Sequence, residues 1–136
     1  MIIEKFYRQR PLNRTRQLLA DEGMDVSLGT LVDGLHRIGG LLQPLYGEII
    51  RRNQASGRWQ MDETRWRVFE QAEGKKTFRW WLWAVLSPDT VVYLLDPSRS
   101  RAVPRKHLGP DPEGTLTADR CSVYPGVGGK IQVSHC

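Results

Sequence analysis

The chain has 136 residues, of which 40% are hydrophobic and 26% are charged, a balance typical of one soluble globular domain. No apolar run approaches the roughly 20 residues that cross a bilayer, and the first residues lack the pattern of a signal peptide, so a cytoplasmic protein without a membrane segment is expected. The net charge of +5 favours a polyanionic partner, although a basic face that binds nothing would carry the same charge.

Residues 1–56 have the pattern of helices. The stretch from Arg14 to Glu22 predicts a short helix that Gly23 ends, and Ser27 stands where the N-cap of a second helix belongs. After Ser27, leucine and isoleucine recur at steps of three and four, which predicts one apolar helix face that packs on the following domain. Gly39-Gly40 and Pro44 interrupt this face and predict a kink or a break.

The same segment also matches a helix-turn-helix, whose second helix would begin at Ser27 and face a DNA groove. Helix pairs joined by a glycine turn are abundant as plain packing units, so both interpretations stay open. Guanidinium groups match phosphate geometry, and arginines crowd the N-terminus. We therefore predict contacts with double-stranded DNA from Arg8, Arg10, Arg14, Arg16, Ser27 and Thr30.

Residues 57–136 have the pattern of a mixed α/β domain. Three successive strands are expected first, as an antiparallel meander, then a helix limited by Pro104, and then two further strands. The expected strands are residues 58–63, 78–86, 91–95, 115–118 and 131–134, with turns at 70–76 and 87–89 and the helix within 97–108. The chain is thus divided into a helical lead-in, 1–56, and an α/β domain, 57–136.

Two aspartates stand where expected strands end. Asp62 lies in Met61-Asp62-Glu63-Thr64, and Asp119 follows the fourth strand. Carboxylates brought together at neighbouring strand ends form an oxygen-rich site suited to Mg²⁺ or Mn²⁺ in phosphoryl transfer. Spacing alone also fits aspartates that cap helices or open turns. Glu63 directly follows Asp62 and should point to the other face of a continuing strand, so it is not predicted as a ligand.

Short motifs along nearly the whole chain resemble the transposases of the insertion sequence 66 family, which are enzymes of bacterial mobile elements. No single motif is decisive, but their common order is hard to obtain by chance. The matching motifs are Pro11-Leu12 with Arg14 and Gln17, Ser27 with Thr30-Leu31, Leu42 with Pro44-Leu45-Tyr46, Met61-Asp62-Glu63-Thr64, Trp81-Leu82-Trp83, Pro97-Ser98-Arg99-Ser100 and Leu108-Gly109.

The resemblance implies a ribonuclease H-like core of the DDE type, here with only a short Gly/Pro-rich segment, 122–130, in its second helix position. It implies that Asp62 and Asp119 are the first two catalytic aspartates and hold Mg²⁺ or Mn²⁺. Arg99 would be a structural or DNA-backbone contact. No small-molecule substrate is expected.

The sequence departs from the family pattern at two places. Arg120-Cys121 follow the second aspartate where the family has Gly-Tyr, although Tyr124 keeps its place. The third catalytic acid, a glutamate, is expected beyond His135-Cys136, so we expect an internal fragment that is inactive alone. The family's covering helix would also be missing from one sheet face, and the apolar surface left there predicts self-association. The alternative function is a DNA-binding remnant of a mobile element without catalysis, and a further alternative is a decay product that merely folds.

Overall fold

The computed structural model describes residues 1–68, 79–119, 123–124 and 126–135. The chain forms two compact units, Met1–Tyr46 and Gly47–Cys136, and each is considered by itself. The long helix α2 (Leu28–Gln54) begins in the first unit, and its last turns belong to the second. The functional division at residues 56 and 57 stays a prediction.

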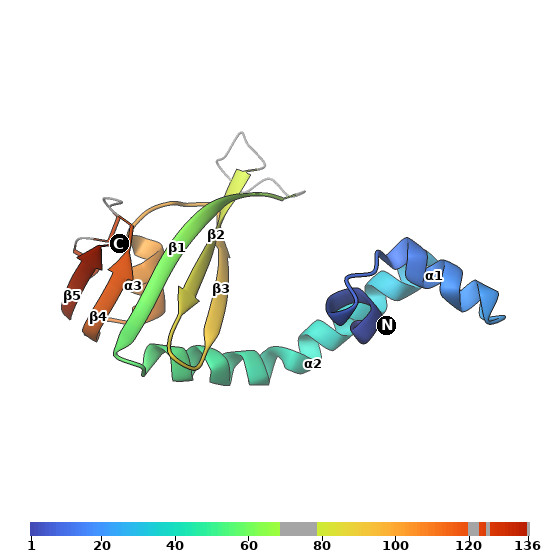
Figure 1. Ribbon diagram of the computed structural model, residues 1–136, viewed down its shortest axis with the longest axis horizontal. Coiled ribbons are helices and arrows are strands. Elements are labelled where there is room, and N and C mark those ends of the chain that lie inside the picture. Colours follow the sequence, from blue (N-terminus) through green and yellow to red (C-terminus); the bar gives the residue numbers. More distant parts are fainter. Residues whose placement is uncertain (69–78, 120–122, 125, 136) are drawn as a thin grey trace. The chain divides into compact units, whose positions relative to one another are not determined.

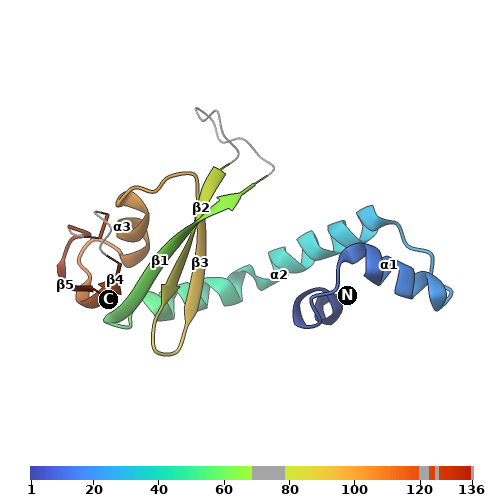
Figure 2. The ribbon, with the colours of Figure 1, turned by 45° about the horizontal axis from the view of Figure 1, so that its top comes forward.

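The first unit is helical, as the sequence predicts. It contains a five-residue π-helix, η1 (Ile3–Tyr7), then α1 (Leu12–Asp21) and the first part of α2, which residues 22–27 connect to α1 (Figure 2). The predicted N-cap is confirmed, because the Ser27 Oγ accepts the Thr30 N–H at 3.0 Å. Gly23 has a φ of +83° just after α1, as expected of a C′ glycine. α2 continues through Pro44, so the chain does not break into two helices there.

The second unit is built on a mixed five-stranded sheet in the order β3-β2-β1-β4-β5 (Figure 1). β1, β2 and β3 pair antiparallel, whereas β4 is parallel to β1 and β5 is parallel to β4. The predicted α/β class and five strands are confirmed, and the turn predicted at 70–76 lies outside the described residues. The strands are β1 (Arg58–Arg67), β2 (Arg79–Leu86), β3 (Val91–Asp96), β4 (Glu113–Ala118) and β5 (Lys130–His135).

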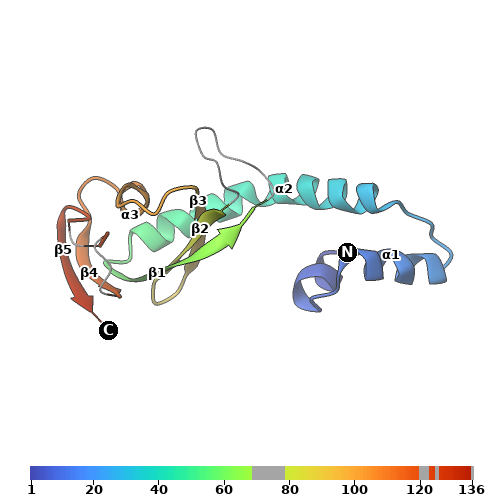
Figure 3. The ribbon, with the colours of Figure 1, turned by 90° about the horizontal axis from the view of Figure 1, so that it is seen from above.

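Alternation along the strands places the core on one face of the sheet. Trp59 and Met61 are buried on β1, whereas the intervening Gln60 is exposed. Leu116 and Ala118 are buried on β4, the parallel neighbour of β1. The short helix α3 (Ala102–Leu108), in the stretch where a helix is predicted, lies to one side of the sheet in the view of Figure 3 and buries an apolar side of its own.

Two glycines allow β1 and β4 to begin side by side. Gly114 has a φ of +144°, and a Cβ there would lie 1.9 Å from the carbonyl oxygen of Gly57. That same carbonyl accepts the Thr115 N–H at 2.9 Å, which starts the parallel pairing. Any larger residue at 114 would push the strands apart at the end where their register is set. The register of β1 against β4 therefore depends on this glycine.

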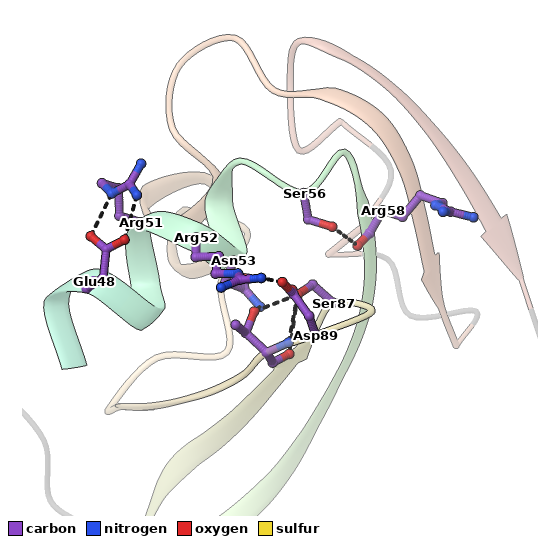
Figure 4. Close-up of polar contacts among 9 residues, drawn as sticks. Glu48, Arg51, Arg52, Asn53, Ser56, Arg58, Ser87 and Asp89 are labelled. Carbon is purple, nitrogen blue, oxygen red and sulfur yellow. Dashed lines mark hydrogen bonds and ion pairs between the residues drawn. The ribbon is translucent and has the colours of Figure 1, made fainter. Parts of the chain in front are cut away.

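Asn53, in the last turn of α2, joins that turn to the sheet and to α3. Its side-chain NH2 donates to the Val85 carbonyl and to the Thr90 hydroxyl, each at 3.2 Å, and its backbone carbonyl accepts the indole N–H of Trp59 at 2.7 Å. The side-chain Oδ1 of Asn53 accepts a ring N–H of His107, on α3, at 2.8 Å. Beside it, Figure 4 shows the exposed ion pair of Arg52 with Asp89 in the turn between β2 and β3. The end of α2 is thus part of the second unit.

Candidate active site

The parallel pairing of β1 with β4 brings the two predicted aspartates to neighbouring positions. Met61 lies opposite Ala118 as the last pair in the register, and both side chains are buried. Asp62 and Asp119 each come one residue later, and both are exposed. Adjacent strands are about 4.8 Å apart, and a step of one residue reverses the side-chain direction. The two aspartates therefore stand next to each other at one end of the parallel pair, away from the buried core.

The carboxylate of Asp62 is bonded to its own strand. Its Oδ1 accepts the backbone N–H of Glu63 at 2.9 Å, which leaves the other carboxylate oxygen without a backbone donor in the described contacts. Across the antiparallel pair its neighbour is Ala84 on β2, a small residue that does not cover it. Asp62 can therefore offer a carboxylate oxygen to a ligand at the protein surface.

Glu63 has its side chain in the opposite environment, only 1% exposed. Arg99 reaches the Oε1 of Glu63 with Nε at 2.8 Å and Nη2 at 2.7 Å, and the Tyr124 hydroxyl donates to Oε2. Alternation along β1 predicts that Glu63 points away from the side of Asp62, but it does not predict these bonds. Glu63 and Arg99 lie 36 residues apart, and Glu63 and Tyr124 lie 61 apart, so no local pattern signals either contact.

The Tyr124 phenol has a raised pKa, to which burial and three carboxylates contribute. Burial raises the pKa of Tyr124 far above its usual range, and the hydrogen bond and charge of Glu63, with the charges of Asp119 and Asp62, raise it further. The phenol therefore stays protonated and acts as a donor at all ordinary pH values. Its ring lies edge-on to that of Trp83, with centroids 6.4 Å apart. The charges of Asp62, Asp119 and Glu63 thus all act on the Tyr124 phenol.

A comparison with known families decides the identity of the chain. The family model described as Transposase IS66 family matches residues 1–136, which is the whole chain. The chain belongs to the IS66 transposase family. The resemblance seen in the sequence is thereby confirmed, and a function related to transposition follows. No curated protein and no solved structure matches it.

Membership in the IS66 transposase family implies, in general terms, that DNA is bound and that a divalent metal ion is used. Within the described residues, no group of three histidine, cysteine, aspartate or glutamate side chains could hold a metal ion. Both oxygens of Glu63, the acid nearest to Asp62, are bonded to Arg99 and Tyr124, so Glu63 is not available as a third metal ligand. Two exposed carboxylates suit a hard cation such as Mg²⁺, which keeps several waters and needs only one or two protein ligands. The donor set therefore fits one ion.

The residues predicted to contact DNA in the first unit of this IS66 family chain differ in their ion pairs, hydrogen bonds and exposure. Arg8 and Arg10 both form ion pairs with Glu4, at 2.5 and 2.8 Å. Arg14 and Arg16 are exposed on α1. The Ser27 hydroxyl is engaged in the cap of α2 and lies 2.9 Å from the hydroxyl of Thr30. A role of these side chains in DNA binding stays a prediction.

Arg99, the remaining predicted DNA contact, is held in the second unit. Besides its ion pair with Glu63, its guanidinium carbon lies 4.7 Å from the ring centroid of Trp81, a cation–π distance. About half of the Arg99 side chain is exposed. The contacts with Glu63 and Trp81 thus support a structural role for Arg99, whereas its contact with a DNA backbone stays a prediction. Among the described residues, no helix is both long and apolar enough to cross a membrane.

Proposed function

We propose that this chain carries part of the metal-dependent site at which an IS66 transposase cleaves and joins DNA, with Asp62 and Asp119 as catalytic carboxylates. The observation that carries the proposal is the parallel register of β1 and β4, in which the aspartates follow the buried pair Met61 and Ala118. The order and directions of the five strands support a ribonuclease H-like core of the DDE type.

The chemistry requires a divalent cation, which Asp62 and Asp119 would hold. When bound, Mg²⁺ or Mn²⁺ activates a water or a 3′-hydroxyl and stabilises the leaving oxygen of the phosphodiester. Asp62 and Asp119 would ligate the ion with exposed oxygens, and the backbone N–H of Glu63 would orient the Asp62 carboxylate. Two carboxylates do not fix the pair of ions used in such reactions, so strand transfer by the chain alone is not expected.

The metal site is tested by titrating the protein with Mn²⁺ and measuring bound ion by electron paramagnetic resonance. The wild type should bind about one ion per chain at the highest affinity, in line with the pair of carboxylates. Asp62→Asn or Asp119→Asn should each abolish this binding. Asp89→Asn is the matched control, since Asp89 is also exposed but is paired with Arg52 and lies in the turn between β2 and β3. Binding that survives both site substitutions would refute the assignment.

The catalytic part is tested by incubating the chain with DNA that carries the element ends, in Mg²⁺ or Mn²⁺. No strand transfer is expected. Metal-dependent nicking that Asp62→Ala abolishes would show that two carboxylates suffice for cleavage, which would overturn the expected inactivity and support the catalytic role.

A non-catalytic DNA-binding function is the second candidate, and the exposure of Arg14 and Arg16 on α1 favours it. Binding should weaken as salt rises and depend little on sequence, because phosphate contacts carry it. Arg14→Ala with Arg16→Ala should lower the slope of log affinity against log salt by about 2. Arg51→Ala with Arg52→Ala is the matched control, since both arginines already form ion pairs. A protein with no affinity for duplex DNA at low salt would exclude this function.

Self-association stays a prediction with a definite surface behind it. β3 forms an edge of the sheet, and Val91, Tyr93 and Leu95 are exposed along one of its faces. Apolar side chains on an edge strand favour pairing with another copy. Sedimentation over a range of protein concentrations tests this, and Tyr93→Lys should shift the equilibrium toward the monomer.

A further inference from the structure

Glu63 is a buried carboxylate whose two oxygens are both bonded. Its side chain is 1% exposed, and a buried charge is tolerated only where it is paired and hydrogen-bonded. Arg99 supplies the charge and its Nε–H to Oε1, with Nη2 also within ion-pair distance, and Tyr124 donates its hydroxyl to Oε2. A glutamate in this environment is held in one position.

The two partners of Glu63 are themselves held by β2. The Tyr124 ring packs edge-on against Trp83 at an interplanar angle of 79°, and the Arg99 guanidinium lies over Trp81. Tyr124 is fully buried and Trp83 nearly so. The Glu63 carboxylate is therefore fixed by groups whose own positions are set by packing, so that the cluster of Glu63, Tyr124 and Arg99 behaves as one unit.

This cluster joins the two parts of the chain that carry the aspartates. Glu63 directly follows Asp62 and donates its backbone N–H to that carboxylate. Tyr124 comes five residues after Asp119 in the chain. The bond from the Tyr124 hydroxyl to Glu63 thus connects the segment after β4 to β1, beside the place where the two aspartates are neighbours in the register. Loss of this bond would let the segments separate without removing either aspartate.

We propose that Glu63 and Tyr124 are positioning residues, which set the separation and orientation of Asp62 and Asp119 for a divalent cation. The inference rests on the catalytic role proposed above for the two aspartates. It assigns to the acid beside Asp62 the task of holding the site, not of ligating the metal. Groups that orient metal ligands commonly change affinity by about 10- to 100-fold when they are removed.

Tyr124→Phe is the sharpest variant, because it removes the hydroxyl and keeps the ring against Trp83. Mn²⁺ affinity should fall by about 10- to 100-fold, as for other groups that orient ligands. Tyr93→Phe is the matched control, since Tyr93 is 60% exposed on β3, and it should leave the affinity unchanged. An affinity of Tyr124→Phe within twofold of the wild type would overturn the proposal.

Two further comparisons separate positioning from general stability. Glu63→Gln and Tyr124→Phe together should weaken Mn²⁺ binding no more than the stronger single variant, since both break the same connection. Arg99→Lys keeps a cation for Glu63 and should retain more Mn²⁺ affinity than Arg99→Ala. Losses that add up in the double variant, or equal losses for Arg99→Lys and Arg99→Ala, would mean that these residues do not act as a unit on the site.

A failure of the metal site and a failure of the positioning role give different results. If the wild type binds no Mn²⁺, or Asp62→Asn binds it equally well, the proposed function is wrong. Amide hydrogen exchange without metal then decides the positioning role. Tyr124→Phe should speed exchange at residues 116–118 of β4 and leave Val92, in the core of the meander, unchanged. Unchanged exchange at 116–118 would overturn the inference even if the metal site were correct.

Discussion

The two compact units of this chain use their side chains in opposite ways. In Met1–Tyr46 the only buried large apolar side chain is Leu31, and Leu41, Leu42 and Leu45 are exposed along α2. In Gly47–Cys136 a tryptophan-rich sheet encloses a core that includes Trp83 and Leu116. A helical unit with so little burial gains little stability from packing, whereas the sheet can hold side chains in fixed positions. The difference in burial therefore predicts that the stability of the chain resides mainly in the second unit.

The ion pairs of Glu4 and Glu63 differ in how far water reaches them. Glu4 joins Arg8 and Arg10 within the first unit; its own side chain is 15% exposed, and that of Arg8 is 58% exposed. Water and salt screen a pair whose arginine is this exposed, so it contributes little to stability. The Glu63 side chain in the second unit is 1% exposed, and removal of Arg99 would leave its charge unpaired and out of water. Glu63 is therefore the more costly of the two carboxylates to leave without its arginine.

The largest expected effect contrasts one leucine from each unit. Leu116→Ala removes a fully buried side chain from β4 and should lower the free energy of unfolding by about 3–5 kcal/mol. Leu45→Ala removes a side chain that is 59% exposed and should cost less than about 0.5 kcal/mol. Urea unfolding followed by far-ultraviolet circular dichroism measures both. Equal losses would mean that the face of α2 around Leu45 is buried in solution, and the contrast between the units would fail.

A second, smaller effect concerns the joint between α2 and the sheet. Asn53→Ala should lower the free energy of unfolding of the second unit by about 2–4 kcal/mol, because it leaves the His107 N–H and the Val85 carbonyl without their partner. All five tryptophans lie in the second unit, so their fluorescence reports its unfolding selectively. Asn13→Ala on exposed α1 is the control and should leave the midpoint unchanged. A midpoint for Asn53→Ala equal to the wild type would show that α2 is not anchored there.

The elements themselves could be predicted because local patterns determine them. Val91 to Leu95 follows the turn residues Ser87-Pro88-Asp89, and the observed β3 differs by one residue. Ser27 was recognisable as a cap because it precedes the apolar periodicity of α2. The end of β1 could not be predicted, since Thr64, Arg65 and Arg67 are exposed and show no alternation of buried and exposed residues. Pairing with β2 holds this part as a strand, and sequence periodicity does not report on pairing.

The candidate site could be predicted only in part, for a related reason. Asp62 and Asp119 could be predicted as a pair because each lies near the end of an expected strand, and the parallel pairing of β1 with β4 makes them neighbours, although β1 continues beyond Asp62 to Arg67. Their catalytic role stays a prediction. The environment of Glu63 could not be derived, because it depends on tertiary contacts with Arg99 and Tyr124 from distant segments. The role of Asn53 could not be predicted for the same reason, since a polar residue near a helix end is usually solvated.

The smallest expected effect is a pH dependence that originates in the second unit. Burial lowers the pKa of His107 below its usual value, and its ring N–H donates to Asn53. Above the ordinary histidine pKa of about 6.5, His107 is neutral in both the folded and unfolded states, so its titration does not lower the free energy of unfolding. As the pH falls below that value, the unfolded state takes up a proton that the folded state refuses, so stability declines until the lowered folded pKa is passed. The slope for one proton cannot exceed about 1.4 kcal/mol per pH unit.

Urea unfolding by tryptophan fluorescence from pH 8 to pH 5 measures this decline. His107→Gln, which retains a side-chain N–H for Asn53, should flatten the profile below pH 6.5, whereas His36→Gln, on exposed α2 in the first unit, should leave it as in the wild type. A profile that flattens with His36→Gln and persists with His107→Gln would place the titrating group in the wrong unit. The sign is also diagnostic, since stability that rose on acidification would require a histidine that gains a charged partner on folding, and His107 faces the neutral amide of Asn53.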